Sequence, residues 1–146
     1  MATDTAVSWG GLAIGSTVLV DSAPWIYVLE ARPRFAPKFT GLFEAAARQE
    51  LVLSLSTITL SEILAGPYKS GETALAKRYE KALAGYRVVE LSTPIAVLAA
   101  QLRSRFALKL PDAIQVATAL EIGADALVTH DRDFSKVRGI SVLMGN

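Results

Sequence analysis

The sequence predicts an α/β fold of three layers, in which helices flank a mostly parallel sheet of about five strands. Short β-branched and aliphatic runs alternate with helical segments along the chain, which favours this class. These runs are apolar at consecutive positions, as is typical of strands covered by helices on both faces. The expected strands are residues 17–20, 51–55, 87–91, 126–129 and 140–143.

Helix boundaries are indicated by hydroxyl and proline residues at the starts and by glycine or proline at the ends. One helix, beginning at Thr57 or Thr59, is expected to end at Gly66-Pro67, because proline lacks a backbone donor and clashes with the preceding turn. The other helices are expected at 22–29, 38–49, 72–84, 93–106 and 111–122.

The length of 146 residues predicts one domain, assigned to residues 17–146, with an N-terminal extension at residues 1–16. The chain has no cysteine, which excludes disulfides, thiolate zinc sites and cysteine nucleophiles. Its single histidine, His130, argues against a histidine-rich metal site or a Ser-His-Asp triad. Site chemistry is therefore expected to come from carboxylates, hydroxyls and basic side chains.

The N-terminal region is uncharged from residue 5 to residue 20, but it is too short for a spanning helix, which needs about 20 apolar residues. The first basic residue is Arg32, so the positive start of a signal peptide is missing. We therefore expect a cytoplasmic protein with no membrane association.

Acidic residues fall where the expected strands end and where the next helices begin. Asp21 follows the first strand, and Asp131 and Asp133 follow the fourth, while Glu62 and Asp112 lie in the first turns of helices. These positions share one edge of a parallel sheet, where ligands of such folds bind. Each acid alone also fits an ordinary role as a helix cap, a turn residue or an exposed surface position.

Convergence of these acids would favour a bound cation. Clustered carboxylates repel one another, and their pKa values rise unless a cation neutralises them. Oxygen-rich sites without histidine suit Mg²⁺ or Mn²⁺. The sequence therefore predicts a hard divalent metal at this edge.

Several segments carry a resemblance to a known family. They are V-L-V-D-S-A-P-W-I at 18–26, S-T-I-T-L-S-E-I-L-A-G-P at 56–67, L-R at 102–103, L-P-D-A-I-Q-V-A-T-A-L at 110–120 and A-D-A-L-V-T-H-D-R-D-F at 124–134. In order and spacing, the chain resembles the PIN-domain ribonucleases, most closely the VapC toxins of VapBC toxin–antitoxin pairs. The resemblance extends over about residues 17–143.

The resemblance implies a Mg²⁺-dependent endoribonuclease, with Mn²⁺ as a substitute, that leaves a 5′-phosphate and a 3′-hydroxyl. Its implied catalytic and metal-binding acids are Asp21, Glu62, Asp112 and Asp131. Ser22 and Thr129 would support these acids, Asp133 would assist them, and Arg103 would contact RNA. The implied partners are an RNA substrate, a VapB-like antitoxin that blocks the acidic site, and a second copy in a homodimer.

The net charge of +1 conceals a basic surface around the acids. Without the four implied catalytic acids, 15 basic and 10 acidic side chains remain, which gives +5. Candidate phosphate contacts are Arg32, Arg34, Lys38, Arg103, Arg105, Lys109, Arg132 and Lys136. Candidate base-stacking residues are Trp25, Tyr27 and Tyr68, although Trp25 also fits a place in the core.

Two alternatives remain open. The chain could be a catalytically degenerate PIN-like module that only binds protein or RNA. It could also be another Mg²⁺-dependent α/β phosphatase or phosphotransfer domain with Asp21 as nucleophile. Such domains usually carry a second Asp two residues later, where this chain has Ala23.

Overall fold

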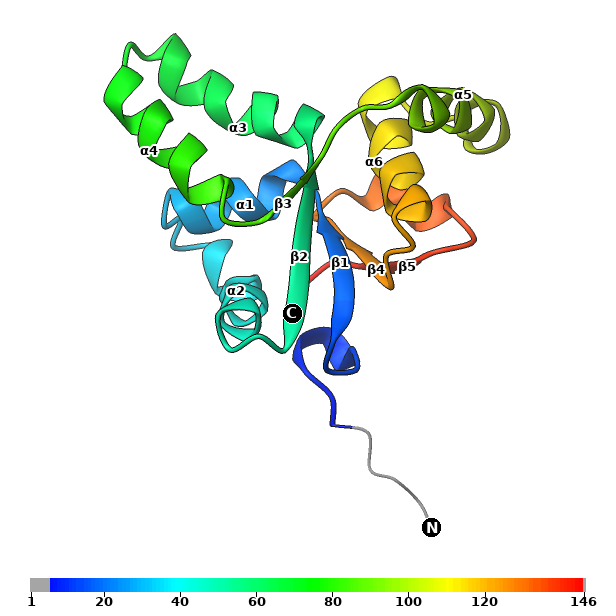
Figure 1. Ribbon diagram of the computed structural model, residues 1–146, viewed down its shortest axis with the longest axis horizontal. Coiled ribbons are helices and arrows are strands. Elements are labelled where there is room, and N and C mark those ends of the chain that lie inside the picture. Colours follow the sequence, from blue (N-terminus) through cyan, green and yellow to red (C-terminus); the bar gives the residue numbers. More distant parts are fainter. Residues whose placement is uncertain (1–5, 146) are drawn as a thin grey trace.

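The computed structural model describes residues 6–145, which include one sheet of five parallel strands in the order β3-β2-β1-β4-β5 (Figure 1). The three-layer α/β prediction is thereby confirmed. The strands are β1 (Ser16–Val20), β2 (Leu51–Ser56), β3 (Arg87–Val89), β4 (Ala126–Val128) and β5 (Ser141–Leu143). The helices are α1 (Ser22–Leu29), α2 (Thr40–Ala47), α3 (Thr57–Lys69), α4 (Thr73–Leu83), α5 (Thr93–Phe106) and α6 (Leu110–Glu121).

Strand β1 lies at the centre of the sheet. Val18 pairs with Leu53 of β2 on one side and with Ala126 of β4 on the other. The last three residues of β1 are completely buried. Continuous burial explains why this strand reads as an unbroken apolar run, since both of its faces are covered.

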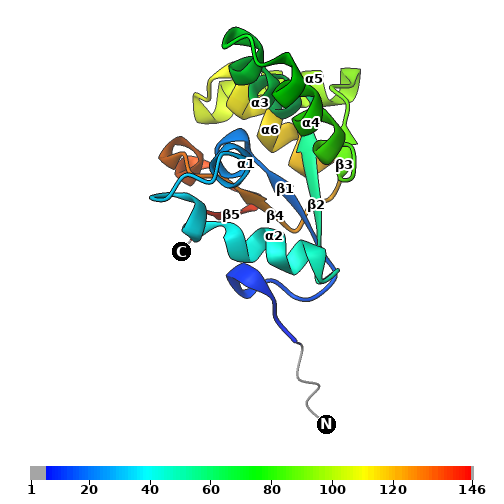
Figure 2. The same ribbon diagram turned by 90° about the vertical axis from the view of Figure 1, so that its left-hand side faces the viewer.

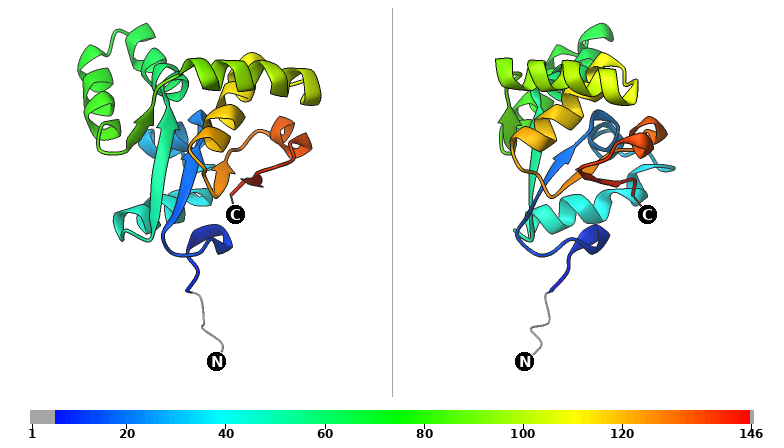
Figure 3. Two further views of the ribbon diagram at one scale, coloured as in Figure 1. Left: turned by 45° about the vertical axis from the view of Figure 1, so that its right-hand side comes forward. Right: turned by 90° about the vertical axis from the view of Figure 1, so that its right-hand side faces the viewer.

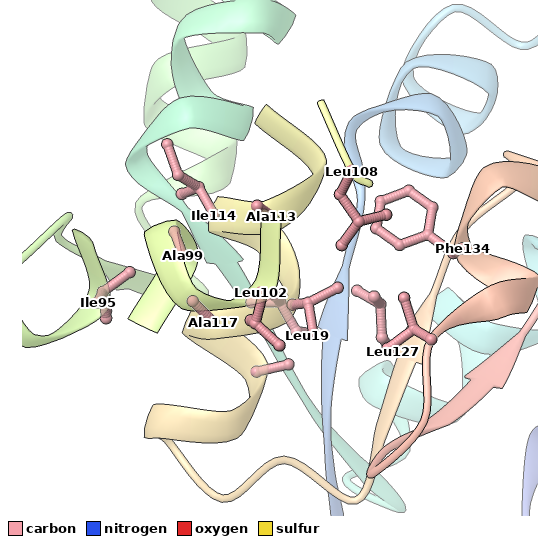
Figure 4. Close-up of a cluster of buried hydrophobic side chains, with 13 residues drawn as sticks. Leu19, Ile95, Ala99, Leu102, Leu108, Ala113, Ile114, Ala117, Leu127 and Phe134 are labelled. Carbon is pink, nitrogen blue, oxygen red and sulfur yellow. The ribbon is translucent and has the colours of Figure 1, made fainter. Parts of the chain in front are cut away.

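One face of the sheet is covered by α5 and α6 (Figures 1 and 3). Leu19 and Leu127 project from β1 and β4 into a cluster with apolar residues of both helices, shown in Figure 4. Phe134, from the 3₁₀ helix Arg132–Lys136, completes this cluster. Seven consecutive residues of α6 are buried. The small alanine side chains of this helix allow such close packing.

The other face is covered by α1 and α2, with α3 and α4 beside them (Figures 1 and 2). Val18 and Val20 point to this side, opposite to Leu19, as the alternation along a strand requires. Trp25 of α1 is 2% exposed, and its indole nitrogen donates to the carbonyl of Val20 at 3.0 Å. Trp25 is therefore a core residue, and its alternative role as a base-stacking residue is wrong.

Helix α3 differs from its predicted end at Gly66-Pro67, because it continues to Lys69 with Pro67 inside it. Pro67 is buried, and its carbonyl accepts the amide of Glu72 at 2.8 Å. Packing and this hydrogen bond offset the lost backbone donor, so the helix ends at Lys69, and Gly71 with a φ of 72° follows it. The other predicted helices and strands agree within about three residues at each end.

The described part of the N-terminal extension packs against the amino ends of the strands (Figure 1). Its Trp9 ring lies 6.4 Å from the ring of Phe39, and Ser8 donates a hydrogen bond to Glu50 at 2.8 Å. An isolated antiparallel bridge joins Val7 to Ala13. This segment thus lies at the end of the sheet opposite to the carboxyl ends of the strands.

Within residues 6–145, no helix has both the length and the apolar character that crossing a bilayer requires.

Candidate functional site

Two strand–helix junctions and the start of α6 bring acidic residues to the carboxyl edge of the sheet. Asp21 follows β1 directly and is the residue before α1. Asp131 follows β4 and caps the 3₁₀ helix Arg132–Lys136, while Asp112 lies in the first turn of α6. The parallel order of β1 and β4 explains this convergence, since both strands end at the same edge.

Asp112, Asp131 and Asp133 form a tight carboxylate cluster. Each offers one oxygen, and these oxygens lie within 4.8 Å of one another. The amide of Asp133 donates to Oδ1 of Asp131 at 2.9 Å, which holds the two residues together. Asp112 is half-buried and the other two are exposed, so the cluster is open to solvent on one side.

The electrostatics of this cluster favour a cation. Burial first, and then the charges of Asp131, Asp21 and Asp133, raise the pKa of Asp112 to about 6, against the opposing charge of Lys109. The two salt bridges among the described residues are Arg32–Glu30 and Arg48–Glu50, and neither involves these acids. Among the described residues, no ion pair neutralises the three carboxylates, so a bound cation would be the natural counter-charge.

Asp21 is held by two neutral donors, one on each oxygen. Thr129 Oγ1 donates to Oδ2 at 2.9 Å, and Gln115 Nε2 donates to Oδ1 at 2.8 Å. The hydroxyl of Thr129 also accepts the amide of Asp131 at 3.0 Å, so it joins Asp21 to Asp131. The structure thus places Thr129 beside the acids, where the sequence predicts it.

Glu62 lies apart from the three-acid cluster. It is exposed on α3, and Ser22 Oγ donates to its Oε1 at 2.9 Å. Glu62 also lines a cavity of about 180 Å³, together with Ile63, Pro67 and Tyr79. Ser22 therefore supports Glu62, whereas Asp21, its neighbour in the chain, is supported by other residues.

Sequence reasoning missed three buried polar residues beneath the acids: Gln115, Ser56 and Thr59. They are at most 2% exposed and bond to one another, with Ser56 Oγ donating to Gln115 Oε1 at 2.7 Å. One signal was present, because Gln115 is a lone amide in an apolar stretch of α6, three residues after Asp112. A residue at that spacing shares a helix face with Asp112.

Arg103 is placed on the last turn of α5, where its Nε donates to the carbonyl of Leu108 at 3.3 Å. This contact braces the segment between α5 and α6 and leaves the exposed guanidinium partly free. Of the aromatic candidates, Tyr68 is 48% exposed. Tyr27 is half-buried, stacks on Phe35 and hydrogen-bonds His130 at 2.9 Å.

The arrangement is chemically suited to hold a hard cation. Its donors are carboxylate oxygens, which Mg²⁺ and Mn²⁺ prefer, and second-layer hydroxyl and amide groups orient them. These residues of the chain thus fit a divalent metal.

The chain is similar to known proteins over most of its length. A model of the PIN domain matches residues 18–140. The chain is similar to a toxin–antitoxin complex from Klebsiella pneumoniae, with 27% identity and a TM-score of 0.69, over 87% of this chain and 96% of that one. No curated protein sequence matches it.

Two further solved structures share the fold at lower identity. One is VapBC2 from Rickettsia felis bound to a promoter DNA fragment, with 16% identity and a TM-score of 0.70, over 86% of this chain and 96% of that one. The other is the Sarcin-Ricin loop cleaving toxin VapC20 of Mycobacterium tuberculosis, with 17% identity and a TM-score of 0.68, over 86% of this chain and 98% of that one.

Proposed function

The chain belongs to the PIN-domain family, and on that premise we propose that it is a metal-dependent endoribonuclease and the toxin of a type II toxin–antitoxin pair. One observation carries the proposal: Asp112, Asp131 and Asp133 place carboxylate oxygens within 4.8 Å of one another, without an ion pair among the described residues. We assign this activity to residues 17–146 as one domain, with residues 1–16 as an extension, and place it in the cytoplasm.

Mg²⁺ is the proposed cofactor, with Mn²⁺ as a substitute. Asp21, Asp112 and Asp131 would hold it, with Glu62 completing the set and Asp133 assisting. When bound, the ion supplies Lewis acidity and lowers the pKa of a coordinated water. The proximity of Asp133 to both Asp112 and Asp131 supports a more direct part for this residue than the sequence suggests.

The chain's own residues would hold the acids in position for the reaction. Thr129 donates to Asp21 and accepts from the Asp131 amide, so it fixes the relative position of two acids. Glu62, to which Ser22 donates a hydrogen bond, would accept a hydrogen bond from an attacking water. Hydrolysis would leave a 5′-phosphate and a 3′-hydroxyl, as the resemblance implies.

The proposed substrate is single-stranded or looped RNA, whose bases can splay and stack. RNA phosphates would contact basic side chains near the acids. One of these is Lys109, whose charge lowers the pKa of Asp112. Arg132 lies between Asp131 and Asp133 in the sequence, and Arg103 lies on the last turn of α5. These three residues are the proposed phosphate contacts.

The proposed partners are a VapB-like antitoxin and a second copy of the chain. Structures of similar fold include toxin–antitoxin complexes. An apolar cavity of about 180 Å³ lies between α1, α2 and α4, lined by Trp25, Val28, Phe43 and Tyr86 among others, and could receive an apolar side chain of an antitoxin. Light scattering after size exclusion, alone and with the neighbouring gene product, tests both partners, and a monomer that ignores that product would contradict them.

The function is tested by incubating purified protein with a synthetic RNA hairpin in Mg²⁺ or in EDTA. We expect cleavage only with the metal, products that can be ligated through a 5′-phosphate, and none from Asp21→Asn or Asp112→Asn. Glu121→Gln is the matched control, because it removes an exposed acid at the far end of α6. Cleavage by Asp112→Asn at the wild-type rate would refute the proposal.

A second experiment, a calorimetric titration with Mn²⁺, distinguishes the degenerate-module alternative. A module that only binds would show no carboxylate-dependent Mn²⁺ binding, measured by calorimetry with Asp112→Asn as the comparison. Retention of the acids and of their supporting hydrogen bonds favours the enzyme over this alternative.

A further inference from the structure

A buried set of hydrogen bonds lies directly beneath the acidic site. Ser56 ends β2, Thr59 lies in the first turn of α3, and Gln115 projects from α6. All three are at most 2% exposed, in a region that otherwise contains apolar side chains. Burying such groups is costly unless each is hydrogen-bonded, and here each one has partners within the set.

The bonding pattern fixes which way the Gln115 amide faces. Ser56 Oγ accepts the amide hydrogen of Thr59 at 3.2 Å and donates its own hydrogen to Gln115 Oε1 at 2.7 Å. The opposite end of the side chain, Nε2, therefore faces Asp21 and Thr59. Its two hydrogens go to Asp21 Oδ1 and to the Thr59 hydroxyl, so every donor and acceptor atom of this amide is used.

The set continues from Thr59 to the second part of the site. The hydroxyls of Thr59 and Ser22 are 3.3 Å apart, and Ser22 donates to Glu62 at 2.9 Å. Because Ser22 has one hydroxyl hydrogen and gives it to Glu62, the Thr59 hydroxyl supplies the hydrogen between the two. The donated hydrogens in this set of hydrogen bonds thus point outward, toward Asp21 at one end and Glu62 at the other.

We propose that Gln115 is a positioning residue for divalent-cation binding, which fixes Asp21 directly and Glu62 through Thr59 and Ser22. This inference rests on the proposed function. Gln115 and Thr129 each engage one oxygen of Asp21, and each oxygen keeps a further lone pair for a cation. Without Gln115, the Asp21 carboxylate would be held on one side only and would lose its connection to Glu62.

The test is Gln115→Met, which keeps the length of the side chain and removes both donors. Calorimetric titration with Mn²⁺ measures the affinity directly, and cleavage of an RNA hairpin is measured at increasing Mn²⁺. We expect Mn²⁺ binding to weaken about 10- to 100-fold, as is usual when a group supporting a metal ligand is lost. The KM for RNA should stay unchanged, and high Mn²⁺ should restore much of kcat.

Thr118→Val is the matched control, because Thr118 is also buried on α6 but its hydroxyl bonds the carbonyl of Ile114, away from the acids. It should bind Mn²⁺ like the wild type. If Gln115→Met does not fold, Ser56→Ala replaces it, because it releases the Gln115 amide without changing α6. We expect a weaker affinity for Mn²⁺ there as well.

Wild-type Mn²⁺ affinity in the folded Gln115→Met or Ser56→Ala protein would overturn the positioning role. This outcome is distinct from failure of the proposed function. In that case the wild-type protein itself would neither bind Mn²⁺ through Asp112 nor cleave RNA, whereas failure of the positioning role leaves both wild-type properties intact.

Discussion

Replacing Asp112 by Asn should abolish cleavage and yet stabilise the metal-free protein. The carboxyl of Asp112 is half-buried, and its pKa is raised from 3.8 to about 6, first by burial and then by the charges of Asp131, Asp21 and Asp133. An ionised Asp112 is therefore unfavourable in the folded state. Asn has nearly the same shape and carries no charge, so the substitution removes this cost while preserving the packing.

The size of the effect follows from the displaced pKa. At about 1.4 kcal/mol per pKa unit, a change from 3.8 to about 6 corresponds to an upper value of about 3 kcal/mol. Partial exposure and screening reduce this by about half. The Asn variant also loses about 0.3–1 kcal/mol of favourable interaction with the α6 amino terminus. We therefore expect a gain of about 1 kcal/mol, which raises Tm by about 3 °C.

The stability gained by Asp112→Asn should depend on pH in a characteristic way. The folded protein holds the Asp112 proton more tightly than the unfolded chain, so the wild type loses stability as the pH rises from about 4 to about 6. Above that range the loss is constant, and below it there is none. The advantage of Asp112→Asn should therefore be complete at pH 7.5 and absent near pH 4.

Thermal unfolding in EDTA, followed by circular dichroism at both pH values, measures this difference. Glu121→Gln serves again as the control and should shift Tm little at either pH, since its side chain is exposed. Saturating Mn²⁺ should raise the Tm of the wild type more than that of Asp112→Asn, because the ion stabilises only the state that binds it. A variant that is no more stable than the wild type at pH 7.5, or equally stabilised at pH 4, would refute the reasoning.

Three further predictions concern packing. Ser54→Ala should leave the free energy of unfolding unchanged or raise it by up to about 1 kcal/mol, because the buried Ser54 hydroxyl has no hydrogen-bond partner among residues 6–145; a clear loss in urea unfolding would contradict this. Trp25→Ala should lower the free energy of unfolding by about 3–5 kcal/mol, since the 2% exposed ring fills the core; a loss below about 1 kcal/mol would count against that packing. Trp9→Ala should cost about 1–3 kcal/mol through its contact with Phe39 and leave kcat unchanged, and a parallel loss of RNA cleavage would show that the N-terminal segment acts on the site.

Much of the fold could be predicted because its signals are local. The buried run at β1 and the proline-initiated helix at α5 each follow from a few neighbouring residues. The position of Asp21 and Asp131 at one edge of the sheet followed from one rule of parallel sheets, whereas Asp112 reaches this edge from a helix that follows another helix. Pro67 was misread because its cost is local, whereas the packing that offsets it is tertiary.

The supporting hydrogen bonds could not be predicted in the same way. Gln115 reaches Ser56 and Asp21 across 59 and 94 residues of sequence, and its role depends on the rotation of α6 against the sheet. Likewise, Ser22 and Asp21 are adjacent in the chain but support different parts of the site. Which neighbour a hydroxyl contacts is decided by the packing of helices, which no spacing in the sequence specifies.

The strand order also determines when the site can exist during synthesis. Strand β1 emerges early from the ribosome, but its partner on one side, β4, is made more than one hundred residues later. Asp21 therefore has no Asp112 or Asp131 near it until those later residues have been synthesised. A prematurely released fragment that ends before β4 lacks Asp131, Asp133 and the supporting Thr129, so it cannot form the three-acid cluster.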